Sequence, residues 1–213
     1  MKYKGIIFDF DGTLADTLPL CFYSFNEIFK KYDQRDLSAE EIVQMFGPSE
    51  AGIIQQNLKA VDQIDKAVEE YYWHYDRAHH EFVGFDPHLR QLLNGLRNEG
   101  YRLGIFTGKG RKSFDISMSK LQLEDFFDVT ITGDDVSSPK PDAEGLYKIL
   151  EVWEMDKTQV LFVGDSDADI ESGTRAGMDT VAVAWFPGSH GRFTQTPTHY
   201  CNEIDRFKML IKP

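Results

Sequence analysis

The feature that most constrains the fold is a regular alternation of short apolar runs with amphipathic stripes in the second half of the chain. Apolar runs rich in β-branched residues occupy residues 103–106, 127–131, 160–163 and 180–184, and another lies at residues 6–8. Between two of these runs, the apolar residues of the 146–153 stripe recur at i, i+3, i+4 and i+7, as one buried helix face requires. Strands that alternate with helices are typical of βαβ units. The sequence therefore predicts an α/β fold, a Rossmann-like parallel sheet with helices on both faces.

A long segment interrupts this alternation after the first predicted strand. That strand ends near Phe10, whereas the next helix of the alternating kind begins near Pro87, and one crossover needs far fewer residues. The segment has apolar stripes of its own, and Ser38 and Glu41 have the spacing of a capping box. We therefore predict an α/β core formed by residues 1–16 and 83–213, with an α-helical cap domain, residues 17–82, inserted between them.

The charge balance narrows the class of partner. The 213 residues include 23 Lys and Arg against 35 Asp and Glu, which gives a net charge of −12. Such a field repels phosphate backbones and anionic membranes, so we expect neither nucleic acid nor a membrane as a partner. The start of the chain is unlike a signal peptide, and the two cysteines, Cys21 and Cys201, have no metal-binding or redox spacing. These features favour a reduced, cytoplasmic protein.

Polar residues follow the predicted strands at the points where the strands end. In chain order these residues are Asp9, Asp11, Thr107, Lys140 and Asp165. Because the carboxyl ends of parallel strands share one edge of a sheet, we expect these side chains to converge. Asp169 would face the same way as Asp165 on a helix. Four carboxylates against one lysine repel one another unless a cation is present, and Mg²⁺ takes oxygen ligands and shares its shell with phosphate.

In type, order and strand context, these residues resemble the four motifs of the haloacid dehalogenase superfamily. The first motif matches Asp-Phe-Asp-Gly-Thr at residues 9–13, the second Thr107, the third Lys140 within Ser-Pro-Lys-Pro, and the fourth Gly-Asp-Ser-Asp-Ala-Asp at residues 164–169. The helical insertion after the first motif is similar to that of the phosphoglycolate phosphatase-like branch. The resemblance covers essentially the whole chain.

The resemblance implies a Mg²⁺-dependent phosphatase that hydrolyses small phosphorylated metabolites through an aspartyl-phosphate intermediate. It implies that Asp9 is the nucleophile and that Asp11 is first the general acid and then the general base. The residues implied to hold the transferring phosphoryl group are Thr107, Gly108 and Lys140. The implied metal ligands are Asp9, the main-chain carbonyl of Asp11, Asp165 and Asp169, the last of these directly or through water.

Two loops are candidates for selecting the substrate. Gly47-Pro48-Ser49-Glu50 separates two predicted cap helices and resembles the substrate-specificity loop of this cap type, although a plain turn with Ser49 as N-cap is an equal alternative. Lys109 and Arg111 would bind a second anionic group of the substrate, or they are solvated charges at a helix start. Phosphoglycolate phosphatases more usually have Asn at position 108, which weakens an assignment to phosphoglycolate itself.

Other functions stay open at this point. An inorganic pyrophosphatase is one, because members of the family differ mainly in the cap. A β-phosphoglucomutase-like phosphotransferase is disfavoured, because the cap loop contains no Ser-Arg pair. Outside enzymes, a phospho-receiver module would not contain the long insertion, and a phosphate-binding regulatory protein would not need all the reactive positions that this chain has.

Overall fold

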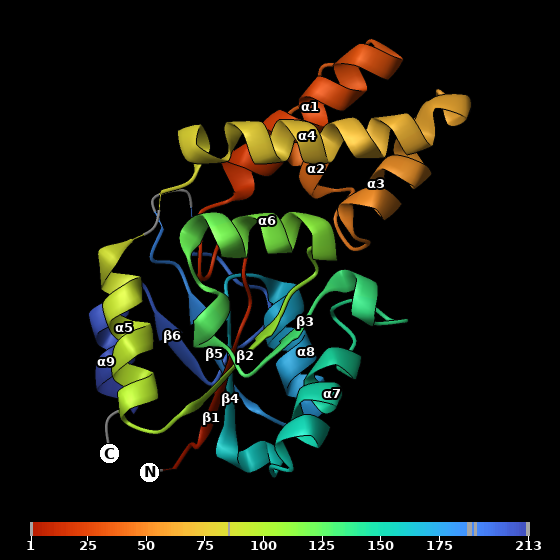
Figure 1. The fold of residues 1–213 in the computed structure, drawn as a ribbon. Coiled ribbons are helices and arrows are strands. Elements are labelled where there is room, and N and C mark those ends of the chain that lie inside the picture. Colours follow the sequence, from red (N-terminus) through yellow and green to blue (C-terminus); the bar gives the residue numbers. More distant parts are fainter. Residues whose placement is uncertain (1, 85, 187–188, 190, 212–213) are drawn as a thin grey trace.

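Among the residues that the computed structural model describes (2–84, 86–186, 189 and 191–211), six strands form one parallel sheet (Figure 1). The strands are β1 (Gly5–Phe8), β2 (Arg102–Phe106), β3 (Val129–Ile131), β4 (Val160–Gly164), β5 (Asp179–Val183) and β6 (His199–Cys201). Their order across the sheet is β3-β2-β1-β4-β5-β6, and each neighbouring pair is parallel. The strand order therefore reverses between β1 and β4, which is where open α/β sheets form binding crevices.

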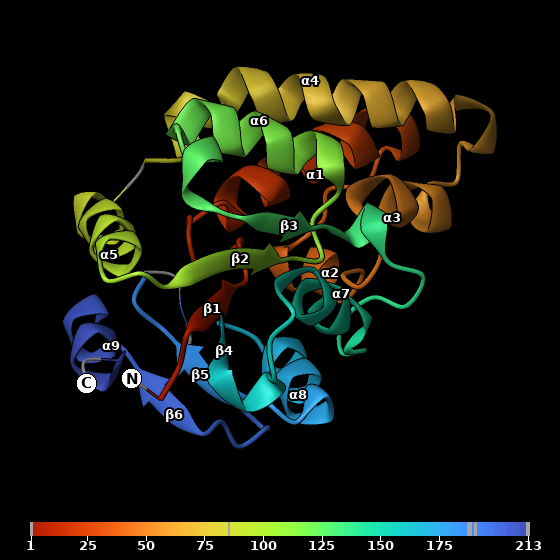
Figure 2. The same cartoon turned by 60° about the horizontal axis from the view of Figure 1, so that its bottom comes forward.

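Helices cover both faces of this sheet (Figures 1 and 2). They are α5 (Pro87–Asn98), α6 (Arg111–Leu121), α7 (Glu144–Trp153), α8 (Asp167–Ala176) and α9 (Ile204–Ile211). Ile6 and Phe8 belong to the buried cluster that includes α5, α6 and α9, whereas Ile7 belongs to the cluster of α7 and α8. This division follows from the two-residue period of a strand. The predicted fold class, a Rossmann-like parallel sheet with helices on both faces, is confirmed.

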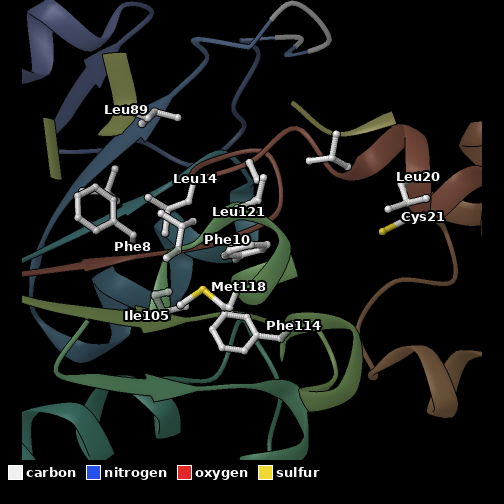
Figure 3. Close-up of a cluster of buried hydrophobic side chains, with 14 of the residues drawn as sticks. Phe8, Phe10, Leu14, Leu20, Cys21, Leu89, Ile105, Phe114, Met118 and Leu121 are labelled. Carbon is white, nitrogen blue, oxygen red and sulfur yellow. The ribbon is translucent and has the colours of Figure 1, made fainter. Parts of the chain in front are cut away.

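The larger of these two apolar clusters continues from the sheet toward the segment after β1. Figure 3 shows Phe10 lying close to Phe114 and Met118 of α6, with Leu20 and Cys21 on the neighbouring helix. The rings of Phe10 and Phe114 meet edge to face with centroids 5.2 Å apart. Side chains from the sheet, α6 and the inserted segment thus share one apolar cluster.

The described residues between β1 and α5 form a short 3₁₀ helix, Val61–Gln63, and four α-helices, which we call the helical layer. They are α1 (Leu18–Asp33), α2 (Ala39–Val43), α3 (Glu50–Asn57) and α4 (Ile64–Phe82). In Figure 1 this layer lies above the sheet, with α4 running alongside α6 and above it. Tyr75 of α4 is hydrogen-bonded to Ser117 of α6 at 2.8 Å, and the buried His79 approaches the same hydroxyl at 3.0 Å. These contacts seat α4 on the helix that follows β2.

The structure refines several predicted elements. The expected capping box at Ser38 and Glu41 is present at the start of α2. The predicted strand at residues 127–131 is shorter, because only Val129–Ile131 pairs with β2 in the ladder. Neither β6 nor α9 is predicted by the sequence pattern, and the three residues of β6 contain no apolar run. No helix in the described part of the chain is both long enough and apolar enough to span a bilayer.

Candidate active site

Three acidic side chains meet at the carboxyl ends of β1 and β4. Asp9 follows β1, Asp165 follows β4, and Asp169 lies in the first turn of α8. Phe8 and Val163 are paired in the ladder, so the residues that follow the two strands emerge side by side. One carboxylate oxygen from each of the three residues lies within 4.8 Å of the others. The structure therefore brings together the side chains of Asp9, Asp165 and Asp169, three of the four residues predicted to bind the metal.

Lys140 faces this carboxylate group from the loop between β3 and α7. Its Nζ lies 2.7 Å from Asp9 Oδ1 and 2.6 Å from Asp169 Oδ1. If all three carboxyl groups are ionised, one ammonium leaves two negative charges without a counter-charge. Three converging carboxylate oxygens are ligands that suit a hard cation such as Mg²⁺. The donor set and its charge therefore fit a divalent ion held by Asp9, Asp165 and Asp169.

Burial and mutual repulsion shift the pKa values in this carboxylate group. Desolvation raises the pKa of Asp9 to about 7, with Lys140 opposing the shift and Asp169 adding to it. Desolvation, followed by the charges of Asp9 and Asp169, raises the pKa of Asp165 well above its ordinary value. Burial lowers the pKa of Lys140, but Asp169 and Asp9 outweigh it and keep that pKa above its ordinary value. Without a cation, Asp9 and Asp165 therefore retain protons at pH values where an isolated carboxyl group has released them.

Two glycines allow the carboxylates to approach the backbone closely. Gly12 has φ +82, a conformation that favours glycine, and a β-carbon there would overlap the Asp165 carboxylate. A β-carbon on Gly164 would overlap the Asp169 side chain in the same way. Thr13 Oγ1 donates a hydrogen bond of 3.3 Å to Asp165 Oδ1. The loop of the first motif therefore packs directly against the acid of the fourth.

Asp169 is held in place by Ser166, a residue with no role among those predicted from the sequence. Ser166 donates from its backbone N–H and its hydroxyl to Asp169 Oδ2, at 3.0 and 2.6 Å. The Asp169 N–H donates back to Ser166 Oγ at 3.3 Å, which completes a capping box at the start of α8. The Ser-x-x-Asp spacing in the sequence is that of a capping box and could have predicted this pair. Because Ser166 binds one carboxylate oxygen, the other is the one that faces Lys140.

The carboxylate of Asp11 is not one of the three that converge. Its Oδ1 accepts a hydrogen bond from Thr17 Oγ1 and lies 3.2 Å from Lys109 Nζ. Thr17 is the residue that precedes α1, so Asp11 lies where the helical layer leaves the core. The side chain therefore occupies a position distinct from the three converging carboxylates. The role of its main-chain carbonyl as a metal ligand stays a prediction.

The loop after β2 borders Lys140. Thr107 is buried directly after β2, and its Oγ1 accepts a hydrogen bond of 3.2 Å from the Lys109 N–H. A β-carbon on Gly108 would lie 4.0 Å from Lys140 Cε, so this part of the loop adjoins the lysine. The three residues predicted to hold a phosphoryl group, Thr107, Gly108 and Lys140, are thus neighbours.

The residues predicted to select the substrate do not form one cluster. Glu50 and Lys109 are both buried, and Lys109 Nζ lies 3.3 Å from Glu50 Oε1. The alternative that Lys109 is a solvated charge is therefore wrong. Ser49 precedes α3, but its side chain makes no capping hydrogen bond, and Gly47 and Pro48 form the turn before it.

Arg111 lies elsewhere. Its guanidinium donates to Thr130 Oγ1 at 3.1 Å and to the Thr130 carbonyl at 3.2 Å, and it pairs with Asp135. These partners belong to β3 and to the 3₁₀ turn that follows it, Gly133–Asp135. The structure therefore does not bring the Arg111 side chain to the carboxylate group.

This geometry can be compared with known proteins. Residues 6–183 match the family model described as haloacid dehalogenase-like hydrolase. The chain belongs to this family. The predicted membership of the haloacid dehalogenase superfamily and the predicted enzyme class, a phosphatase of the haloacid dehalogenase type, are both confirmed.

Relatives support the same family assignment. Pyrophosphatase PpaX of Bacillus mycoides (strain KBAB4) is 34% identical over 187 residues, which cover 87% of this chain and 85% of that protein. A predicted phosphoglycolate phosphatase from Haemophilus somnus 129PT has a similar structure, with a TM-score of 0.83, 20% identity and coverage of 100% and 99% of the two chains. CbbY from Rhodobacter sphaeroides in complex with phosphate gives a TM-score of 0.81, with 19% identity and 95% of each chain covered. At these identities, the two structural neighbours show the fold that this haloacid dehalogenase-like hydrolase shares with them.

Proposed function

We propose that this chain is a Mg²⁺-dependent phosphatase that hydrolyses small phosphorylated metabolites through an aspartyl-phosphate intermediate. The observation that carries the proposal is the convergence of Asp9, Asp165 and Asp169 within 4.8 Å, with Lys140 bonded to two of them. Asp9, Asp165, the Asp11 carbonyl and Asp169 would hold the ion. When bound, Mg²⁺ draws negative charge away from the phosphoryl oxygens.

Asp9 is the proposed nucleophile. Its carboxylate oxygen forms a bond to phosphorus while the bond from phosphorus to the leaving oxygen breaks. Asp11 donates a proton to that leaving oxygen, which departs as an alcohol. Asp11 then takes a proton from a water molecule, whose oxygen attacks phosphorus and releases both inorganic phosphate and the Asp9 carboxylate. The cycle returns every residue to its starting state.

The phosphoryl group itself would be held by the loop after β2 and by Lys140. The Thr107 hydroxyl and the Gly108 amide would donate hydrogen bonds to its oxygens, and Lys140 would supply the positive charge. Lys140 already bonds to Asp9, so its ammonium lies beside the proposed nucleophile. This arrangement reduces the repulsion between an anionic nucleophile and an anionic substrate. The helical layer, residues 17–82, would act as a cap that excludes water.

Two classes of substrate should be tested first. A phosphate ester of a small, cytoplasmic metabolite is the proposed substrate, because the resemblance is to phosphoglycolate phosphatase-like proteins. Inorganic pyrophosphate is the second candidate, favoured by the 34% identity to a protein named pyrophosphatase PpaX. A phosphotransferase would pass the phosphoryl group to a sugar phosphate instead of to water.

The test measures phosphate release from p-nitrophenyl phosphate, inorganic pyrophosphate and a panel of metabolite esters, with Mg²⁺ or with EDTA. We expect turnover that requires Mg²⁺ and that Asp9→Asn lowers by more than about 10⁴-fold, the scale of a lost nucleophile. The exposed Asp205→Asn is the matched control and should keep full activity. Turnover that persists in EDTA or in Asp9→Asn would overturn the proposal, and phosphate transfer to a sugar phosphate without release would indicate the mutase. Phosphate binding with no turnover on any substrate would indicate a regulatory protein.

A further inference from the structure

Lys109 is buried where the helical layer meets the core. Its side chain is 0% exposed, and its Nζ lies 3.2 Å from Asp11 Oδ1 and 3.3 Å from Glu50 Oε1. The ammonium also lies 4.5 Å from the centre of the Tyr75 ring, a cation–π contact. Removing an ammonium from water costs several kcal/mol, so such a lysine requires partners that stay in place. One partner belongs to the loop after β1 and the other to α3.

Glu50 reaches from the helical layer into the core. It is the first residue of α3, and its Oε2 accepts a hydrogen bond of 2.7 Å from the Gly110 N–H. Its Oε1 accepts a hydrogen bond from Ser113 Oγ. Gly110 precedes the first residue of α6, so the carboxylate lies at the positive end of that helix. One acidic side chain of the layer thus contacts three residues of the core: Lys109, Gly110 and Ser113.

Gly110 has no space for a side chain. A β-carbon at this position would overlap Glu50 Oε2, although the φ of −68 is one that alanine adopts readily. Gly110→Ala would therefore displace the Glu50 carboxylate without altering any charged residue. This gives a second way to disturb the same contact.

Asp11 is the third member of this buried set. Thr17 Oγ1 donates to one of its carboxylate oxygens, and Lys109 Nζ lies within 3.4 Å of both. The position of the Asp11 side chain thus depends on Lys109, whose position depends in turn on Glu50. Lys109 and Glu50 each have a partner of opposite charge within the protein.

We propose that Glu50 and Lys109 are positioning residues, whose buried ion pair aligns Asp11 only when the helical layer is seated on the core, and that they do not select the substrate. This inference rests on the proposed function, in which Asp11 transfers the proton. It replaces the expectation that Glu50 and Lys109 recognise a group on the substrate. A residue that acts through Asp11 changes kcat, whereas one that reads the substrate changes KM and the preference among substrates.

The first experiment measures kcat and KM of Glu50→Gln with p-nitrophenyl phosphate and with each ester that the wild type hydrolyses. We expect kcat to fall about 10- to 100-fold on every substrate, as for a lost charged hydrogen bond, with KM nearly unchanged. In an Asp11→Asn background, Glu50→Gln should add almost nothing, because both changes act on one group. A changed order of preference among substrates, or additive effects with Asp11→Asn, would overturn the inference.

The matched control is Glu70→Gln. Glu70 also pairs with a lysine, Lys31, at 2.7 Å, but both residues belong to the helical layer. This change should leave kcat and KM at wild-type values. Gly110→Ala should lower kcat in the same direction as Glu50→Gln, and it keeps the test available if the glutamine variant does not fold.

The second experiment does not depend on turnover. Cys21 is buried on α1, with its Sγ 3.7 Å from Lys109 Nζ, so its reaction with a thiol reagent reports how often the layer lifts from the core. In a Cys201→Ser background, Glu50→Gln and Gly110→Ala should accelerate labelling of Cys21 about tenfold, whereas Glu70→Gln should not. Unchanged labelling in both variants would overturn the seating role of Glu50. If the wild type releases no phosphate from any substrate, the proposed function fails while this labelling result still decides the seating role.

Discussion

Lys109, whose side chain is 0% exposed, and Lys140, whose side chain is 9% exposed, each face two carboxylates, but those carboxylates come from different parts of the molecule. The partners of Lys140 are Asp9 and Asp169, both attached to strands and helices of the core. The partners of Lys109 are Asp11 of the core and Glu50 of the helical layer. The contacts of Lys140 are also shorter, 2.7 and 2.6 Å against 3.2 and 3.3 Å. One ammonium is therefore fixed within a single unit, whereas the other depends on two units remaining together.

Replacing Lys140 should give the largest effect. Lys140→Met removes the positive charge beside the proposed nucleophile, and we expect kcat to fall about 10³-fold on every substrate. Labelling of Cys21 should stay at the wild-type rate, because no contact between the layer and the core is lost. Lys148→Met, which removes a lysine from the half-exposed Lys148–Glu144 pair, serves as the control. Accelerated labelling in Lys140→Met would show that the two lysines are not independent.

Replacing Lys109 should give the next largest effect. Lys109→Met leaves Asp11 and Glu50 facing each other without a cation, and we expect kcat to fall about 10- to 100-fold. Cys21 should also become more reactive, which Lys140→Met does not predict. Lys31→Met removes the matched lysine of the helical layer and should change neither quantity. An activity loss without faster labelling would mean that Lys109 acts on catalysis alone.

The effect of Mg²⁺ on the melting temperature should depend on pH through the carboxylate group around Lys140 and not through the Glu50–Lys109 pair. The raised pKa values of Asp9 and Asp165 mean that the metal-free folded protein binds protons that the unfolded chain has released, so their contribution to stability falls as pH rises from about 4 toward 7. An ion that replaces those protons binds better at higher pH. We therefore expect Mg²⁺ to raise the melting temperature more at pH 8 than at pH 6. Asp165→Asn should remove this difference, whereas Glu50→Gln should keep it.

The smallest expected effect is a change in the pH dependence of stability caused by His79, which contacts Ser117 of α6. Burial, followed by the charges of His80 and Lys120, lowers the pKa of His79 to about 4. Between this value and the unfolded value near 6.5, the unfolded chain binds more protons, so stability falls as pH decreases through this window. Urea unfolding should show a loss on the order of 1–3 kcal/mol from pH 7 to pH 4.5 that is smaller in His79→Gln. His88→Gln alters an exposed histidine on α5 and should keep the wild-type dependence.

The carboxylate group could be predicted from the sequence because strand ends determine its members. Asp9 and Asp165 each follow an apolar run, and the pairing of the two strands then places them side by side. Their approach to Lys140 needed only the rule that parallel strands end at one edge. The α/β fold could also be predicted from the sequence, apart from β6, whose three residues have no apolar pattern.

The contacts between layer and core could not be predicted in the same way. The pairing of Glu50 with Lys109 depends on how α3 is seated against α6, and no periodicity in either segment encodes that arrangement. The sequence alone favours a surface position for Lys109, because lysine is seldom buried without a partner. Its partners, Asp11 and Glu50, are distant in the chain, so the sequence does not indicate them. Likewise, nothing local to Thr17 indicates that its hydroxyl bonds to Asp11.

The glycines beside the carboxylates have a consequence for mutational tolerance. At Gly12 and Gly164, even one added carbon would collide with an acidic side chain, so neither position can accept another residue without rearranging the centre. In the turn before α3, by contrast, a β-carbon on Gly47 would meet no neighbour, although its φ of +145 still favours glycine. A saturation library would therefore separate positions restricted by crowding from positions restricted by backbone geometry alone.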